Sequence, residues 1–201
     1  MAIAALDIRG AKVLVVLMPK VCSISIREAV SRLVPNTWGD YQHDFRRARW
    51  PNYTRIAFVR NPWDRLVGAW ADKIRKRYDQ DDPQMFSGFV RYGWPMDMEF
   101  AQFAEAACSM PDEQRNCHFS LQVPLLTQAD EWCVDFLGRF ERIAADWNRL
   151  RAMFPKLGEL PHAHSSEHEP YTAYYTPELR KLVRKAYALD ITRFGYTFGG
   201  K

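Results

Sequence analysis

The strongest constraint on the fold is a short apolar run near the start of the 201-residue chain. Residues 13–18 read V-L-V-V-L-M, and all six are β-branched or aliphatic. An unbroken run of this kind is typical of a strand buried on both faces of a parallel sheet. Residues 56–59 repeat the pattern, and residues 134–137 repeat it more weakly. The sequence therefore predicts a sheet whose strands are joined by long connections.

Helix signals follow these strands. Ser23 is a suitable N-cap for a helix that ends before Pro35, and Pro62 suits the first turn of a second helix with one apolar face. Further helices are predicted at residues 97–108, 141–153 and 176–188. Strands that alternate with helices predict a three-layer α/β fold, with a mainly parallel central sheet flanked by helices. With no repeat or linker in the sequence, we expect a single domain over residues 1–201.

The charge balance narrows the classes of partner. The chain has 28 basic and 24 acidic residues, a net charge of +4. This excess suits an anionic ligand, but the basic clusters at residues 46–49 and 73–77 fit solvated faces better than a nucleic-acid stripe. The apolar run at residues 13–18 is too short to span a bilayer. We expect a soluble, cytoplasmic protein with no membrane span, although a trimmed luminal domain would have the same sequence features.

Metal binding is not expected. The four cysteines form no C-x-x-C pair, so free thiols are the default, and Cys108 and Cys117 would be the pair to bridge in an oxidising compartment. His162, His164 and His168 lie close in sequence, but their spacing matches no common zinc signature. We expect a polar loop there.

The turn after the first strand, P-K-V-C-S-I-S at residues 19–25, has the composition of an anion site. Backbone N–H groups at a helix N-terminus are unsatisfied, and the helix dipole favours negative charge there. Lys20 adds a full charge, and Ser23 and Ser25 add hydroxyl donors. The glycines of a Walker A loop are missing, which argues against an ordinary ATPase or GTPase. Taken alone, an ordinary strand-to-helix turn with a serine cap explains this segment as well.

The second strand ends in F-V-R-N-P-W-D-R-L-V-G-A-W at residues 58–70, with Arg60 where a fixed guanidinium can hold a phosphate. Together, the two segments resemble the nucleotide loops of sulfotransferases that use 3′-phosphoadenosine 5′-phosphosulfate (PAPS), especially the carbohydrate and heparan sulfate 2-O-sulfotransferase group. The resemblance implies a P-loop-like fold and a binding site for PAPS, or for its product PAP. The implied donor-site residues are Pro19, Lys20, Val21, Cys22, Ser23, Ile24 and Ser25 at the 5′-phosphosulfate, and Arg60 at the 3′-phosphate.

One position departs from the family pattern. Gly68 stands where the family has a serine that joins the arginine at the 3′-phosphate. We expect Asp64 and Arg65 to pair locally or brace the helix. The resemblance continues through residues 136–147 and 164–196, and it implies that the loop around Ser165 and Ser166 approaches the nucleotide.

Sulfuryl transfer also needs charge stabilisation at the leaving oxygen and a general base. We assign the first task to Lys20. For the second, the resemblance favours His43, which precedes the arginine-bearing strand, and His118, in an H-F-x-x-Q segment at residues 118–122, is the alternative. His43 could equally be an ordinary surface histidine beside Asp44.

The sequence thus predicts an enzyme that moves a sulfuryl group from PAPS to a hydroxyl or amine, on a small-molecule or glycan acceptor. Two alternatives stay open. A non-catalytic PAP-binding protein is favoured by Gly68, and a nucleotide-dependent kinase would require Walker glycines and a magnesium carboxylate, neither of which is evident.

Overall fold

The computed structural model describes residues 5–30, 33, 41–75, 92–95, 97–161 and 169–200. These residues form two compact units. The first contains the described residues up to Arg60 and those from Gln122 to residue 161. The second contains those from Asn61 to Leu121 and those from residue 169 onward. The expectation of one domain over residues 1–201 stays a prediction.

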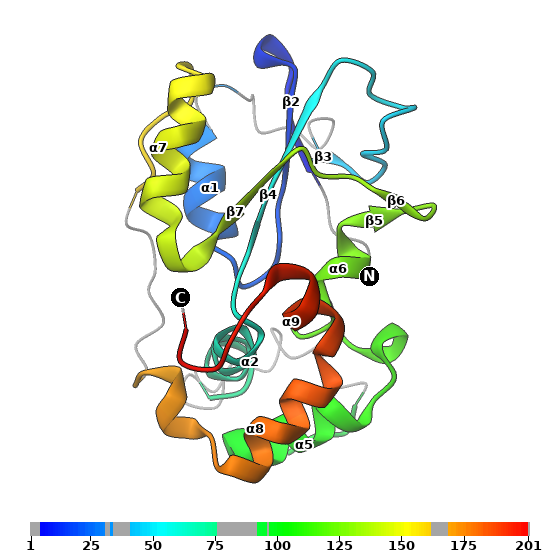
Figure 1. Cartoon of the computed structure of the whole chain (residues 1–201), viewed down its shortest axis with the longest axis vertical. Coiled ribbons are helices and arrows are strands. Elements are labelled where there is room, and N and C mark those ends of the chain that lie inside the picture. Colours follow the sequence, from blue (N-terminus) through cyan, green and yellow to red (C-terminus); the bar gives the residue numbers. More distant parts are fainter. Residues whose placement is uncertain are drawn as a thin grey trace. The chain divides into compact units, whose positions relative to one another are not determined.

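The first unit is built on a mixed sheet with the strand order β3-β1-β2-β4-β7 within the described residues (Figure 1). Its strands are β1 (Ala5–Ile8), β2 (Val13–Val16), β3 (Tyr41–Gln42), β4 (Thr54–Val59) and β7 (Phe136–Arg139). The three strands predicted from the apolar runs, β2, β4 and β7, are parallel: Val15 pairs with Ile56, and Ile56 with Phe136. The α/β class and the parallel pairing of these strands are confirmed.

Two strands of this sheet, β1 and β3, were not predicted. β1 pairs antiparallel with β2 and with β3, which makes this edge of the sheet antiparallel. The four-residue β1 segment contains Asp7, which is buried, so its sequence shows no continuous apolar run. Only the pairing with β2, across the short turn η1 (Arg9–Ala11), makes it a strand.

The third predicted strand begins two residues later than expected. Asp135 lies before β7 and binds Arg55 of β4: the Arg55 N–H donates to the Asp135 carboxylate at 2.8 Å, and the Asp135 N–H donates to the Arg55 carbonyl at 2.8 Å. β7 then starts at Phe136. Gly138 is required beside Phe58, because a Cβ there would lie 2.3 Å from the Phe58 ring.

Among its described residues the first unit has three α-helices, α1 (Ser23–Val30), α6 (Gln122–Leu125) and α7 (Ile143–Met153). The predicted starts of α1 and α7 are close to those observed. Trp147 of α7 is buried and lies 6.1 Å from the Phe58 ring, so α7 packs on the sheet. Figure 1 shows α1 and α7 beside each other along the sheet. A small hairpin, β5 (Thr127–Gln128) and β6 (Glu131–Trp132), precedes β7.

The second unit is helical within its described residues. Its elements are α2 (Pro62–Trp70), the π-helical turn η4 (Ala71–Arg75), α5 (Phe100–Ser109), η6 (Asp112–Gln114), η8 (Tyr171–Tyr174), α8 (Pro177–Ala186) and α9 (Ala188–Phe194). The predicted apolar face of α2 is buried. It packs with α5 and α8 around a core that is rich in aromatic rings.

Capping residues set the helix ends. Asn61 caps α2, with its side-chain oxygen accepting from the Trp63 N–H at 3.2 Å. Thr176 caps α8 in the same way, as its position before Pro177 predicts. α5 begins at Phe100, three residues later than predicted, because Glu99 and Gln102 form a capping box there. No helix among the described residues is long and apolar enough to cross a membrane.

Candidate functional site

The loop between β2 and α1 has an unusual backbone. Lys20 and Cys22 have positive φ angles of 65° and 51°, although neither is glycine. Non-glycine residues in this region cost energy and tend to occur at functional sites. Here the two residues turn the chain into α1 without the glycines of a Walker A loop. The first intrahelical bond runs from Ile26 N to Cys22 O at 2.9 Å, so the N–H groups of Ser23 to Ser25 precede it at the helix N-terminus.

Arg60, at the end of β4, contacts this loop. Its Nη1 donates to the Lys20 carbonyl at 3.2 Å. Its positive charge also acts on Cys22: burial raises the pKa of the Cys22 thiol, and the Arg60 charge opposes the increase. The predicted donor residues Lys20, Cys22 and Arg60 therefore meet within the first unit. Together with the α1 N-terminus, they concentrate N–H donors and positive charge, which is the chemistry that a phosphate or sulfate group requires.

Two side chains hold Arg60. Gln122, which is fully buried, accepts from the Arg60 N–H at 3.0 Å and donates to the Arg60 carbonyl at 2.9 Å. Phe140 packs under the guanidinium, with its ring centroid 4.0 Å from the Arg60 Cζ. The backbone and the charged group of Arg60 are thus fixed separately. Gln122 is the glutamine of the H-F-x-x-Q segment, and its position here gives that residue a structural role.

His43 is exposed and lies on a segment that the first unit holds by its backbone. Gln128 donates to the His43 carbonyl at 2.7 Å and accepts from the Phe45 N–H at 2.9 Å. The buried guanidinium of Arg55 donates to the Phe45 carbonyl at 2.7 Å. Asp44 binds Arg46 at 2.8 Å, and these hydrogen bonds lower the pKa of the Asp44 carboxyl to about 2.

His118 lies in the second unit, and its ring is oriented by Asn116. The buried Asn116 side-chain oxygen accepts from the His118 backbone N–H at 3.1 Å, which identifies that atom as oxygen rather than nitrogen. The same oxygen is hydrogen-bonded to His118 Nδ1. An amide oxygen only accepts, so Nδ1 carries the proton and the neutral ring has its lone pair on Nε2. In that tautomer Nε2 is the atom that can accept a proton.

Arg65 holds the backbone on both sides of His118. Its side chain is 1% exposed, and it donates to the Ser120 carbonyl at 2.6 Å and to the Cys117 carbonyl at 2.7 Å. Burial lowers the pKa of Arg65, and the nearby charge of Asp190 opposes this effect. The sequence suggested only that Arg65 pairs locally or braces its helix, whereas the structure gives it a specific contact with the turn that carries His118.

The other predicted residues are Gly68 and residues that the structure does not describe. Gly68 is buried within α2 in the second unit. Ser165, Ser166 and the three histidines at residues 162, 164 and 168 lie outside the described residues. No group of metal-ligating side chains occurs among the residues that are described. The described cysteines, including Cys108 and Cys117, are free thiols.

The sequence did not predict the roles of Asn116 and Phe140, or the two hydrogen bonds between Gln122 and the backbone of Arg60. Asn116 has a local signal, since it lies two residues before His118. For Phe140 and Gln122 the sequence gives no signal of the contact with Arg60, because they lie 80 and 62 residues away from it along the chain.

Comparison with known proteins gives the family. Residues 21–197 match the profile described as "Sulfotransferase family". Human carbohydrate sulfotransferase 9 is 27% identical over 167 residues, an alignment that covers 72% of this chain and 38% of that relative. The chain thus spans well under half the length of this relative. No solved structure matches the chain significantly. Because the profile match includes α1, the Arg60 strand and the C-terminal helices, the chain belongs to the sulfotransferase family.

Proposed function

We propose that the protein transfers a sulfuryl group from PAPS to a hydroxyl, or to an amine, by in-line displacement. The observation that carries the proposal is the contact between Arg60 and the Lys20 loop. It joins the two segments whose sequences match the donor loops of the family, and it does so beside the N-terminus of α1. Family membership supports the PAPS-dependent transferase chemistry.

The hydrogen-bond donors and positive charges of the first unit fit a bisphosphorylated nucleotide. The N–H groups from Cys22 to Ser25 and the Lys20 ammonium would hold the 5′-phosphosulfate, with Ser23 and Ser25 as hydroxyl donors. Arg60 would hold the 3′-phosphate, since the planar fork of a guanidinium matches the geometry of a phosphate group. Pro19, Val21 and Ile24 complete the loop.

When bound, PAPS supplies a sulfuryl group whose S–O bond to the phosphate breaks as the bond to the acceptor oxygen forms. Lys20 would stabilise the negative charge that develops on the leaving phosphate oxygen, where a compact ammonium is most effective. A histidine would take the acceptor proton. The products would be the sulfated acceptor, PAP and a protonated base.

For the base we propose His118 ahead of His43. The hydrogen bond from His118 Nδ1 to Asn116 selects the Nε2-acceptor tautomer, and Arg65 fixes the turn around it. His43 is exposed, and the contact described above involves its backbone carbonyl. His43 remains the candidate that the family resemblance favours, because it precedes the strand that leads to Arg60.

A non-catalytic PAP-binding protein is the second candidate, and Gly68 is the observation that favours it. The glycine removes a hydroxyl that the family uses at the 3′-phosphate. An acceptor screen with ³⁵S-labelled PAPS separates the enzyme from the binding protein. It tests hydroxyl and amine acceptors, both glycans and small molecules, and mass spectrometry detects the added sulfate. Nucleotide binding without transfer to any acceptor would favour the second candidate.

Arg60→Ala is expected to remove most of the preference for adenosine 3′,5′-bisphosphate over 5′-AMP. Loss of hydrogen bonds to a charged group costs about 1.5–3 kcal/mol, which corresponds to roughly a 10- to 100-fold weaker affinity for the bisphosphate alone. Isothermal titration calorimetry with both nucleotides measures this. Equal affinities of the unsubstituted protein for the two nucleotides would refute the donor assignment.

Gln122→Ala is expected to weaken the same preference without removing any group that touches the nucleotide. The substitution leaves the buried Arg60 N–H and carbonyl without their partner, which lowers stability by about 1–3 kcal/mol and frees the guanidinium to move. Gln128→Ala is the matched control, because Gln128 also joins two backbone groups of the first unit. The control should lose stability but keep the nucleotide preference. Equal loss of preference in both variants would indicate a general folding defect.

A further inference from the structure

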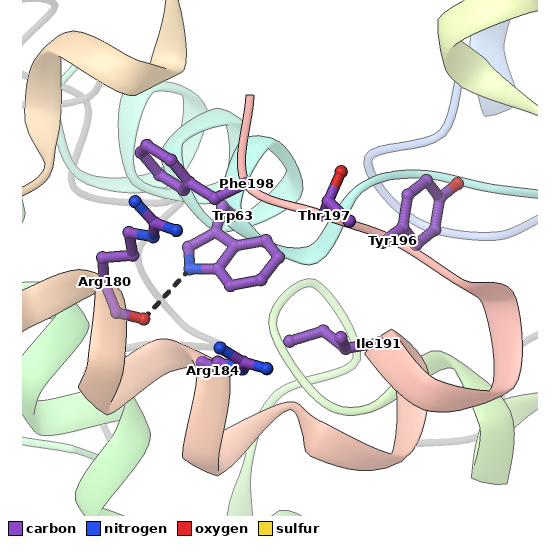
Figure 2. A pocket seen from close by; sticks show the side chains of 7 residues that line it. All are labelled: Trp63, Arg180, Arg184, Ile191, Tyr196, Thr197 and Phe198. Atoms are coloured by element: carbon purple, nitrogen blue, oxygen red, sulfur yellow. Dashed lines mark hydrogen bonds between the residues drawn. The ribbon is translucent and has the colours of Figure 1, made fainter. Parts of the chain in front are cut away.

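The second unit contains a small recess that no step of the proposed reaction uses. It has a volume of about 120 Å³. Pockets for whole drug-sized ligands have volumes of about 300–1,000 Å³, so this recess suits one chemical group of a larger ligand. Figure 2 shows it between α8 and the C-terminal segment. The lining residues are Trp63, Arg180, Arg184, Ile191, Tyr196, Thr197 and Phe198.

Two arginines give the recess its charge. Arg180 and Arg184 are exposed and lie four residues apart on α8, a spacing that puts two side chains on the same face of a helix. Within the described part of the chain, no carboxylate forms an ion pair with either guanidinium. Like charges at this spacing destabilise a helix, and an anion held between them would reverse that effect.

Apolar groups form the rest of the wall. The Trp63 indole is 2% exposed, and its Nε1 donates to the Arg180 carbonyl at 3.3 Å, which fixes the ring beneath the recess. The Phe198 ring lies 4.7 Å from the Arg180 Cζ and holds that guanidinium in place. Figure 2 shows the Trp63 ring together with both arginine side chains at the recess. Charges beside an apolar wall interact more strongly than charges in open solvent, because less water screens them.

We propose that this recess binds an oxyanion carried on a ring, with a sulfate ester as the anionic group. The planar guanidinium fork suits a tetrahedral oxyanion, and the wall of Trp63, Ile191 and Phe198 contacts a ring that an inorganic ion lacks. The inference goes beyond the proposed function, because no residue of the proposed PAPS site lines this recess. Only the choice of sulfate rests on that function, since a sulfotransferase produces sulfated rings.

The test measures binding to the full chain in the absence of PAPS, so its failure is distinct from failure of the donor assignment. The probes are phenyl sulfate, N-acetylglucosamine 6-sulfate, inorganic sulfate and phenol. Titrations are followed by the ¹⁵N–¹H signal of the Trp63 indole, which reports on the recess itself. We expect one of the two ring sulfates to bind at least about 10-fold more tightly than phenol, the factor that one hydrogen bond to a charged group supplies. It should also bind more tightly than inorganic sulfate, which lacks a ring to contact the apolar wall. The tighter one identifies the ring as aryl or sugar.

Arg184→Ala should weaken binding of that ring sulfate by about 10-fold, and Lys185→Ala by less than about twofold. Both changes remove one positive charge from the last turn of α8, but only Arg184 lines the recess. Arg184→Lys, which keeps the charge and loses the fork, should bind with intermediate affinity. Equal weakening by Arg184→Ala and Lys185→Ala would overturn the proposal, as would equal binding of inorganic sulfate and the ring sulfates, or an unchanged Trp63 signal.

Discussion

His118→Ala is expected to lower sulfate transfer to a hydroxyl acceptor by about 10²–10⁴-fold, the usual cost of removing a general base. Binding of adenosine 3′,5′-bisphosphate should stay nearly unchanged, because the base contacts the acceptor and not the nucleotide. The comparison is made with His43→Ala in the same assay, and circular dichroism checks the fold of both variants. If His43→Ala is the inactive variant and His118→Ala retains turnover, the base is His43. If both stay active, neither histidine is the base.

Asn116 provides a sharper form of this test. Asn116→Asp keeps an oxygen acceptor for His118 Nδ1 but adds a negative charge, which favours the protonated imidazolium. A base must be neutral to accept a proton, so the acid limb of the pH–rate profile should move to higher pH. A purely structural role for Asn116 would lower the rate without moving that limb. An unshifted limb would therefore count against His118 as the base.

Lys20→Ala is expected to lower kcat by about 10²–10³-fold, similar to the loss of one preorganised group that stabilises transition-state charge. Ground-state binding of PAP should weaken much less, because the ammonium matters most as the S–O bond breaks. A loss confined to KM would contradict this role. Lys20→Arg should rescue activity only in part, since the planar fork cannot place a compact charge at the same point.

Lys12 is a matched control for this substitution. It also has a positive φ angle, 53°, and it also lies in the first unit, but it precedes β2 whereas Lys20 follows it. Lys12→Ala removes the same charge from the same backbone conformation. It should leave kcat unchanged. A similar loss in both variants would indicate that net charge or loop strain, rather than the Lys20 ammonium, controls the rate.

The local sequence determined much of the fold, because the relevant forces act over a few residues. The apolar runs of β2 and β4 lack any polar residue that would reach solvent, so only a buried parallel strand suits them. Asn61 and Thr176 each precede a proline at a helix start, and the side chain of each caps its helix. The sequence also allowed the segments at Lys20 and Arg60 to be proposed as donor loops, since their residue types and order resemble those of the family.

Tertiary structure decided what those local signals left open. Asp7 gives β1 the sequence of a loop, and pairing with β2 makes it a strand. Gln122 and Phe140 act on Arg60 from distant positions, and sequence spacing cannot predict such contacts. The protonated nitrogen of His118 likewise depends on where the Asn116 oxygen lies. Hydrogen bonds and ring contacts require atoms within a few ångströms of one another, and only the folded chain brings residues far apart in sequence that close.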